Sequence, residues 1–95
     1  MAAYVIFFVE KTRDPQKIAA YRARVRATLE GHNATVRILH GHRDVVEGAP
    51  MEEIAMLEFP TFEEAQNWYR SPAYQDVVAL RFAGADCRAV IVQGV

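Results

Sequence analysis

Residues 57–78 read LEFPTFEEAQNWYRSPAYQDVV and set the architecture of the whole chain. An apolar run ends at Phe59, and Thr61 with Glu64 has the Ser/Thr-x-x-Glu spacing of a capping box, so a helix is predicted to begin directly after a strand. The Ser-Pro pair at 71–72 then stops that helix and supplies the residue types of an N-cap and a first helical position. A second, short helix is therefore predicted from residue 72.

The segments on either side alternate between strand and helix patterns. Strands are predicted at residues 3–9, 34–40, 53–59 and 88–93, a helix from Pro15 to the turn at Gly31, an extra edge segment at 43–47 and a turn at 84–86. This order is a doubled split βαβ unit. It predicts a single α+β domain over residues 1–95 with a ferredoxin-like fold, in which an antiparallel sheet carries its helices on one side.

The predicted strands are apolar on both faces, which two helices cannot cover. Residues 3–9 are nearly all β-branched or aromatic, and the strand at 53–59 places Ile54 and Met56 opposite Leu57 and Phe59. A large apolar face left in water would be an aggregation liability or an interface. We therefore predict a homodimer that packs the two uncovered faces together, because a two-fold contact uses the same surface twice.

Composition and charge narrow the choice of partners. Eleven Lys and Arg against twelve Asp and Glu give a net charge of −1, and the basic residues are spread along the chain, which argues against nucleic-acid binding. The densest basic group, Arg22, Arg24 and Arg26, is interpreted as a solvated helix flank. The apolar run at residues 3–9 is too short for a membrane span and lacks the features of a secretory signal, and the single Cys87 fits a reducing compartment. We expect a cytoplasmic protein that binds neither nucleic acid nor membrane.

Several motifs resemble a known family. They are LEFPT at 57–61, NWYRSPAYQ at 67–75 with an arginine at 81, and QGV at 93–95. Over essentially its whole length the chain resembles the domain of unknown function 1330 family, within the dimeric α/β-barrel superfamily. The resemblance implies small subunits whose sheets pair into a barrel across a dimer, with a cleft between each sheet and its own helices. It also implies kinship with cofactor-independent monooxygenases, lactone isomerases and haem-handling enzymes.

Two positions depart from the family pattern. The family has an arginine late in the second strand, where this chain has Leu39, and His-Gly-Gly after the first helix, where this chain has His-Asn-Ala at 32–34. Arg37 lies two residues before Leu39 on the same predicted strand face. It is therefore the candidate substitute for the family arginine.

Tyr74 and Arg81 are candidate ligand-binding and catalytic residues. They are seven residues apart, which is two helical turns, and so share a face of the short helix predicted from residue 72. If that face lines the cleft, Arg81 could hold a carboxylate or enolate by paired hydrogen bonds, and Tyr74 could exchange a proton. The structural alternative is that Arg81 caps carbonyls or pairs with Asp76 or Asp86, and that Tyr74 packs in the core.

His40 ends the second predicted strand, at the mouth of the expected cleft. The ordinary histidine pKa of about 6.5 suits a general base at neutral pH, and hydrogen bonding at the rim is the alternative. His32, His40 and His42 lack the acidic and second-shell pattern of a zinc site, so no metal site is predicted. The acidic Glu53 is interpreted as a surface charge.

Aromatic side chains of the helices are the predicted lining of the cleft. Tyr21, Trp68 and Tyr69 suit a flat organic ligand, although core packing explains the same residues. The preferred function is a small-molecule enzyme without a bound organic cofactor. It would act on a carbonyl-bearing or aromatic acid by proton transfer, isomerisation or cofactor-independent oxygenation, and the alternative is a non-catalytic ligand-binding or structural dimer. The candidate catalytic residues are His40, Tyr69 and Arg81, and the candidate substrate-binding residues are Tyr21, Arg37, Trp68 and Tyr74.

Overall fold

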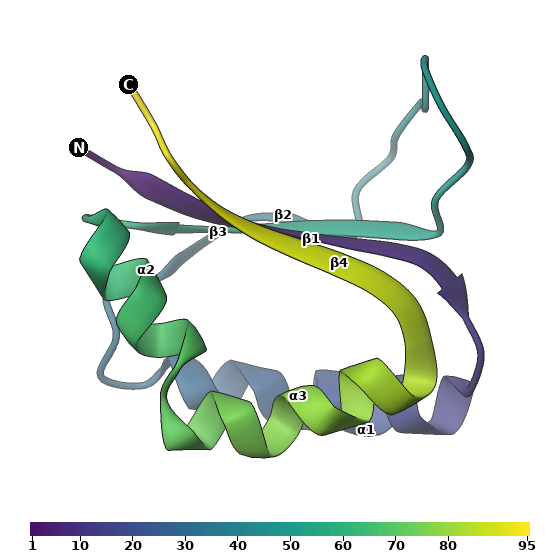
Figure 1. Cartoon of the computed structure of the whole chain (residues 1–95), viewed down its shortest axis with the longest axis horizontal. Coiled ribbons are helices and arrows are strands. Elements are labelled where there is room, and N and C mark those ends of the chain that lie inside the picture. The colour runs from purple at the N-terminus through teal and green to yellow at the C-terminus, as the bar shows by residue number, and fades with distance from the viewer.

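The computed structural model describes all 95 residues and contains one antiparallel sheet with the helices packed against one face (Figure 1). The elements are β1 (Ala3–Thr12), α1 (Pro15–Val25) followed by a short 3-10 helix η1 (Arg26–Leu29), β2 (Thr35–Leu39), β3 (Glu53–Phe59), α2 (Phe62–Tyr69), α3 (Pro72–Gly84) and β4 (Ala85–Gln93). The strand order across the sheet is β2-β3-β1-β4. The predicted α+β, ferredoxin-like arrangement is confirmed. None of the helices has the length and apolar character that crossing a membrane requires.

The predicted helix starts are also confirmed, and each has its own cap. The side chains of Asp14, Thr61 and Ser71 accept hydrogen bonds from backbone N–H groups in the first turns of α1, α2 and α3, at 3.1, 3.1 and 3.3 Å. These bonds satisfy N–H groups that have no partner within the helix. Short local signals in the sequence therefore fix where all three helices begin.

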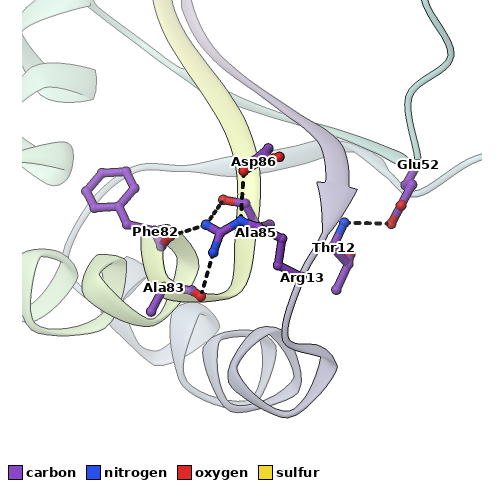
Figure 2. A network of polar contacts seen from close by, with 7 residues as sticks. All are labelled: Thr12, Arg13, Glu52, Phe82, Ala83, Ala85 and Asp86. Carbon is purple, nitrogen blue, oxygen red and sulfur yellow. Dashed lines mark hydrogen bonds and ion pairs between the residues drawn. The ribbon is translucent and has the colours of Figure 1, made fainter.

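The end of α3 differs from the prediction of a short helix and a turn. α3 is 13 residues long and lies beside α1, and Gly84 is followed directly by the first residue of β4. The backbone N–H groups of Arg13 and Asp14 donate to the Gly84 carbonyl at 2.8 and 2.9 Å. The Arg13 side chain also donates to the Phe82 and Ala85 carbonyls at 2.8 and 3.1 Å (Figure 2). Because distant residues satisfy the end of the helix, no separate turn is needed.

Residues 41–52 connect β2 to β3 without the predicted edge segment at 43–47. The connection extends on the side of the sheet away from the helices, and residues 41–50 are all exposed (Figure 1). Val45 and Val46 are residue types that favour strands, but strand formation depends on a neighbour to pair with. No strand lies beside this part of the chain, so the prediction was wrong here.

The core is built around Trp68, which is fully buried between α2 and the sheet. Its ring packs edge-on against Phe7 and stacks on Phe59, with centroids 6.1 and 5.8 Å apart. Its Nε1 donates to the Thr28 hydroxyl at 3.1 Å, and that hydroxyl donates to the Val25 carbonyl at 2.6 Å. The indole therefore joins α2 to β1, β3 and η1 without leaving a polar atom unpaired.

The opposite face of the sheet has no helix over it. Side chains alternate along β1, so the first face carries Ala3, Val5, Phe7 and Val9, which are buried, and the other face carries Tyr4, Ile6 and Phe8. Ile6 pairs with Met56 of β3 on one side and Val90 of β4 on the other, and Val90 is 46% exposed. A continuous apolar surface thus crosses three strands.

Candidate functional site

A cavity of about 340 Å³ lies between the sheet and α1. Residues of β1, β2, β3, α1 and η1 form its walls, with Trp68 of α2 and Arg81 of α3. Thirteen of its eighteen lining residues are hydrophobic, Tyr21 among them, and the other five are Arg22, Arg26, His40, Glu53 and Arg81. A cavity with apolar walls and a few charged groups suits a ligand with an apolar body and an anionic group.

Arg81 is the most deeply placed charge of the cavity, at 3% exposure. Its Nη2 donates to the carbonyls of Arg88 and Phe8 at 2.9 and 3.4 Å, and its guanidinium carbon lies 5.0 Å from the Phe7 ring centroid. It forms no ion pair, since Asp86 pairs with Arg13 at 2.7 Å instead. Nε and Nη1 make no hydrogen bond within the chain. Because every fully enclosed side-chain nitrogen has a partner, these two atoms keep some accessible surface, and Arg81 lines the cavity.

Tyr21 and Tyr74 form a pair between the cavity and the core. Their hydroxyl oxygens are 3.0 Å apart, and their rings meet edge to face at 6.3 Å. Tyr74 is fully buried and does not line the cavity, whereas Tyr21 does. Burial raises the pKa of both phenols, against a smaller lowering by the positive charge of Arg81. Both hydroxyls therefore keep their protons at neutral pH.

His40, Glu53 and Arg22 come together at the mouth of the cavity. Arg22 Nη2 pairs with Glu53 Oε1, and His40 Nδ1 lies 3.7 Å from Glu53 Oε2. Burial, followed by the positive charges of Arg22 and Arg43, holds the pKa of His40 below its ordinary value. The imidazole is therefore neutral near pH 7, and the 3.7 Å separation from Glu53 is too long for a hydrogen bond.

β2 carries an irregularity that changes which side chains face the cavity. Its register with β3 shifts between Val36 and Ile38, and His40 adopts a left-handed φ of 53°. Ile38, Leu39 and His40 consequently all line the cavity, although strict alternation would separate Leu39 from the other two. Arg37 instead points to the uncovered face, where its Nε donates to Glu58 Oε1 at 3.1 Å. It does not occupy the place proposed for it as substitute for the family arginine.

The structure thus brings together only part of the predicted site. Tyr21, His40, Trp68 and Arg81 line one cavity. Tyr69 lies outside it, with its ring 6.3 Å from Trp68 and 5.1 Å from Tyr74, so its proposed contact with a ligand in this cavity has no structural basis. Tyr74 reaches the cavity only through Tyr21, and Arg37 does not reach it.

The sequence analysis missed three charged residues of the cavity. Arg22 and Arg26 are exposed, in agreement with their interpretation as a solvated flank, but they also line the cavity, as does the partly buried Glu53. The available signal was the spacing of Ile18, Arg22 and Arg26, which follow one another at four-residue intervals along the inward stripe. No three His, Cys, Asp or Glu side chains lie together in a way that could hold a metal ion.

Similar folds occur among solved structures of low sequence identity. A protein of unknown function from Rhodopseudomonas palustris matches with a TM-score of 0.77 at 17% identity, over 99% of this chain and 82% of its own. A dimeric ferredoxin-like protein of unknown function from a Jannaschia species matches with a TM-score of 0.76 at 12% identity, over 99% and 100%. SnoaB, a cofactor-independent oxygenase from Streptomyces nogalater, matches with a TM-score of 0.67 at 13% identity, over 99% and 92%. At such identities the likeness shows the fold alone.

Sequence comparison identifies the family. A comparison with curated proteins finds no match. One family model, described as Domain of unknown function (DUF1330), matches residues 2–95. The match spans the LEFPT and NWYRSPAYQ motifs and every element of the fold. The chain therefore belongs to the domain of unknown function 1330 family.

Proposed function

We propose that the cavity binds a small carbonyl-bearing or aromatic acid, with Arg81 as the residue that holds its anionic group. The observation that carries this proposal is that Arg81 lines the cavity at 3% exposure with no ion pair and with no partner in the chain for Nε and Nη1. Buried charges are normally paired, because an unpaired one loses its hydration without compensation. The N–H of Nε shares a side of the guanidinium with Nη2 and not with Nη1, so Arg81 can donate a charge-assisted hydrogen bond to a carboxylate oxygen from Nε or from Nη1.

The rest of the cavity complements such a ligand. Tyr21 lines the same space, and Trp68, Leu57 and Phe7 offer apolar surface to a ring or short chain. We assign Tyr74 as the donor and Tyr21 as the acceptor of the hydrogen bond between them, because the Tyr74 hydroxyl has no other partner. The Tyr21 proton is then available to the ligand's anionic oxygen.

His40 is the candidate general base of a proton-transfer reaction. Its lowered pKa keeps the imidazole neutral at pH 7, which is the form that accepts a proton. The imidazole would take a proton from a carbon beside the ligand's carbonyl, leaving an enolate whose negative charge is stabilised by Arg81. If the ligand carries a double bond between the β and γ carbons, the enolate is conjugated, and return of that proton to the γ carbon moves the double bond, completes an isomerisation and restores neutral His40, with no bound organic cofactor.

A non-catalytic ligand-binding protein is the second candidate function. It is favoured by the positions of Tyr69 and Tyr74, which leave His40 as the single candidate base at the cavity. His40→Gln separates the two candidates, because it should abolish proton exchange at the ligand carbon while leaving ligand affinity within about threefold. Exchange is measured as deuterium incorporation from heavy water by NMR.

The binding proposal is tested by calorimetry and thermal shift with benzoate, phenylpyruvate and cinnamate, and with their neutral amides. We expect at least one acid to raise the melting temperature and its amide to have no effect. Arg81→Met, which keeps the volume and removes the charge, should abolish binding while circular dichroism shows a folded protein. Arg24→Gln, an exposed arginine outside the cavity, is the matched control. Unchanged affinity in folded Arg81→Met would refute the assignment.

The homodimer is part of the same proposal. The uncovered face presents Tyr4, Ile6 and Phe8 beside Met56 and Val90, and related folds are described as dimeric. Val90→Lys/Val92→Lys places two charges on that face and should convert the dimer to a monomer in analytical ultracentrifugation. Val46→Lys, at an 81% exposed position in the β2–β3 connection, should leave the dimer intact. A wild-type chain that sediments as a monomer at high concentration would contradict the dimer.

A further inference from the structure

The charges that line the cavity do not balance. Arg22, Arg26 and Arg81 face it with one carboxylate, Glu53, and His40 is neutral, so two positive charges remain uncompensated. The whole chain, in contrast, has a net charge of −1. A local excess of positive charge inside an otherwise apolar cavity indicates more than one anionic group on the ligand.

The two uncompensated arginines lie at different depths. Arg81 comes from α3 and is fixed at the inner end by the carbonyls of Phe8 in β1 and Arg88 in β4. Arg26 is the first residue of η1, is exposed, and forms no ion pair with any carboxylate of the chain. Arg22, one turn before Arg26, is already engaged by Glu53. Arg26 is therefore the free cation at the outer end.

The wall between these two arginines is apolar. Ile18, Val25 and Leu29 approach from the helical side, and Val36, Leu57 and Ala55 from the sheet. At about 340 Å³ the cavity is at the small end of the ~300–1,000 Å³ range of ligand pockets, which corresponds to a single ring or a short chain. A ligand that reaches from Arg81 to the mouth must cross this apolar section.

Resting on the proposed function, we infer that the ligand is a dianion: an apolar ring or short chain with one carboxylate at Arg81 and a second anionic group at Arg26. The inner group contributes most of the affinity, because Arg81 is shielded from water. The outer group contributes discrimination of about fivefold, the range of exposed ion pairs, and this contribution weakens with salt.

The inference is tested with pairs of probes that differ only in the outer charge. Terephthalate, isophthalate and adipate are each compared with their half-amides, which keep the shape and replace one carboxylate by a neutral group. We expect at least one dianion to bind about fivefold more tightly than its half-amide in 20 mM salt, with the difference largely lost in 0.5 M salt. Arg26→Gln should remove this difference and leave affinity for the half-amide unchanged.

Arg24→Gln is the matched control, since Arg24 lies two residues from Arg26, is exposed beside Ala27 and α3, and does not line the cavity. It should preserve the full preference for the dianion. Equal affinity for dianion and half-amide in every pair would overturn the inference while leaving the proposed function intact. An equal loss of affinity for the dianion and the half-amide in Arg26→Gln would also overturn it, because that result indicates that Arg26 attracts all anions and does not bind the second anionic group specifically. If none of the mono-acids and none of these probes binds, the proposed function fails and the inference fails with it.

Discussion

The hydroxyl of Tyr74, which is fully enclosed, lies 3.0 Å from the hydroxyl of Tyr21, which borders the cavity. This contact is the one polar link between the closed aromatic core and the candidate binding site. It makes the two residues unequal, because Tyr21 lines the cavity, whereas Tyr74 is fully buried and its hydroxyl has no other partner. The consequences for stability follow from that difference.

Tyr21→Phe should destabilise the protein more than Tyr74→Phe. The first change leaves the enclosed Tyr74 hydroxyl without a partner and should cost about 1–3 kcal/mol, whereas the second leaves Tyr21 able to bond within the cavity and should cost about 0.5–1.5 kcal/mol. The double variant removes both hydroxyls and should be less destabilised than the sum of the single variants. Urea denaturation of the four proteins gives the comparison. An equal loss in the two single variants would contradict the proposed inequality.

The same pair should make the protein sensitive to alkaline pH. Burial raises the pKa of both phenols above 10.0, so the folded protein keeps protons that the unfolded chain releases. The free energy of unfolding contributed by the pair is therefore unaffected below pH 10 and falls as the pH rises above it, by up to about 1.4 kcal/mol per pH unit for each group. Denaturation midpoints at pH 9, 10 and 11 should fall less steeply in Tyr21→Phe/Tyr74→Phe. Parallel curves for the two proteins would rule out this contribution.

Arg13 should be important for stability although its side chain is about half exposed. It donates to the carbonyls of Phe82 and Ala85 at the end of α3 and pairs with Asp86 at 2.7 Å (Figure 2). Arg13→Ala should cost about 1–2 kcal/mol, because several carbonyls at the end of the helix lose their donor together. Arg13→Lys should recover only a small part of the lost stability, since one ammonium cannot reach the several acceptors that the planar guanidinium contacts together.

Urea denaturation measures these variants, with Arg24→Ala as the control for loss of an exposed arginine from the same region of the chain. Asp86→Asn should have a smaller effect than Arg13→Ala, because it removes the ion pair and keeps the carbonyl contacts. If Arg13→Ala were no more destabilising than Arg24→Ala, the capping role would be wrong.

The sequence predicts the parts of the fold that depend on neighbouring residues. Asp14, Thr61 and Ser71 act through N–H groups within three positions, so their roles are readable from spacing. The end of α3 is not readable in this way, because Arg13 satisfies it from about 70 positions earlier in the chain. For the same reason, a segment with strand-forming residues at 43–47 gave a wrong prediction when no partner strand was beside it.

The candidate site, like the fold, is only partly predictable from the sequence. Tyr21, Trp68 and Arg81 lie where helical periodicity places them. Arg37 and Leu39 were predicted on one face, but only Leu39 lines the cavity, because the register of β2 shifts after Val36 and such a shift changes which side chains face the cavity. Nothing in the residues at 36–40 marks that shift. A site that includes an irregular edge strand therefore requires the structure.

His40 should titrate below pH 6.5, and its pKa should depend on Arg22. Burial is the larger cause of the lowered pKa, and the charges of Arg22 and Arg43 add to it. Arg22→Gln removes one of these charges and frees the Glu53 carboxylate, whose Oε2 lies 3.7 Å from His40 Nδ1, so the pKa should rise. An NMR titration of the ring protons gives the midpoint, with the signal assigned by its loss in His40→Gln.

The lowered pKa of His40 should also make the protein less stable at acid pH. Because the pKa of His40 is lower in the folded protein than in the unfolded chain, the unfolded chain binds the proton first as the pH falls through 6.5, and stability decreases toward acid. Arg22→Gln should make the contribution of His40 to this decrease smaller, and Arg24→Gln, outside the cavity, should leave both the midpoint and the acid dependence unchanged. A His40 midpoint that is the same in Arg22→Gln and in the wild type would show that burial alone sets the pKa, and the role of the charged mouth in keeping this base neutral would have to be abandoned.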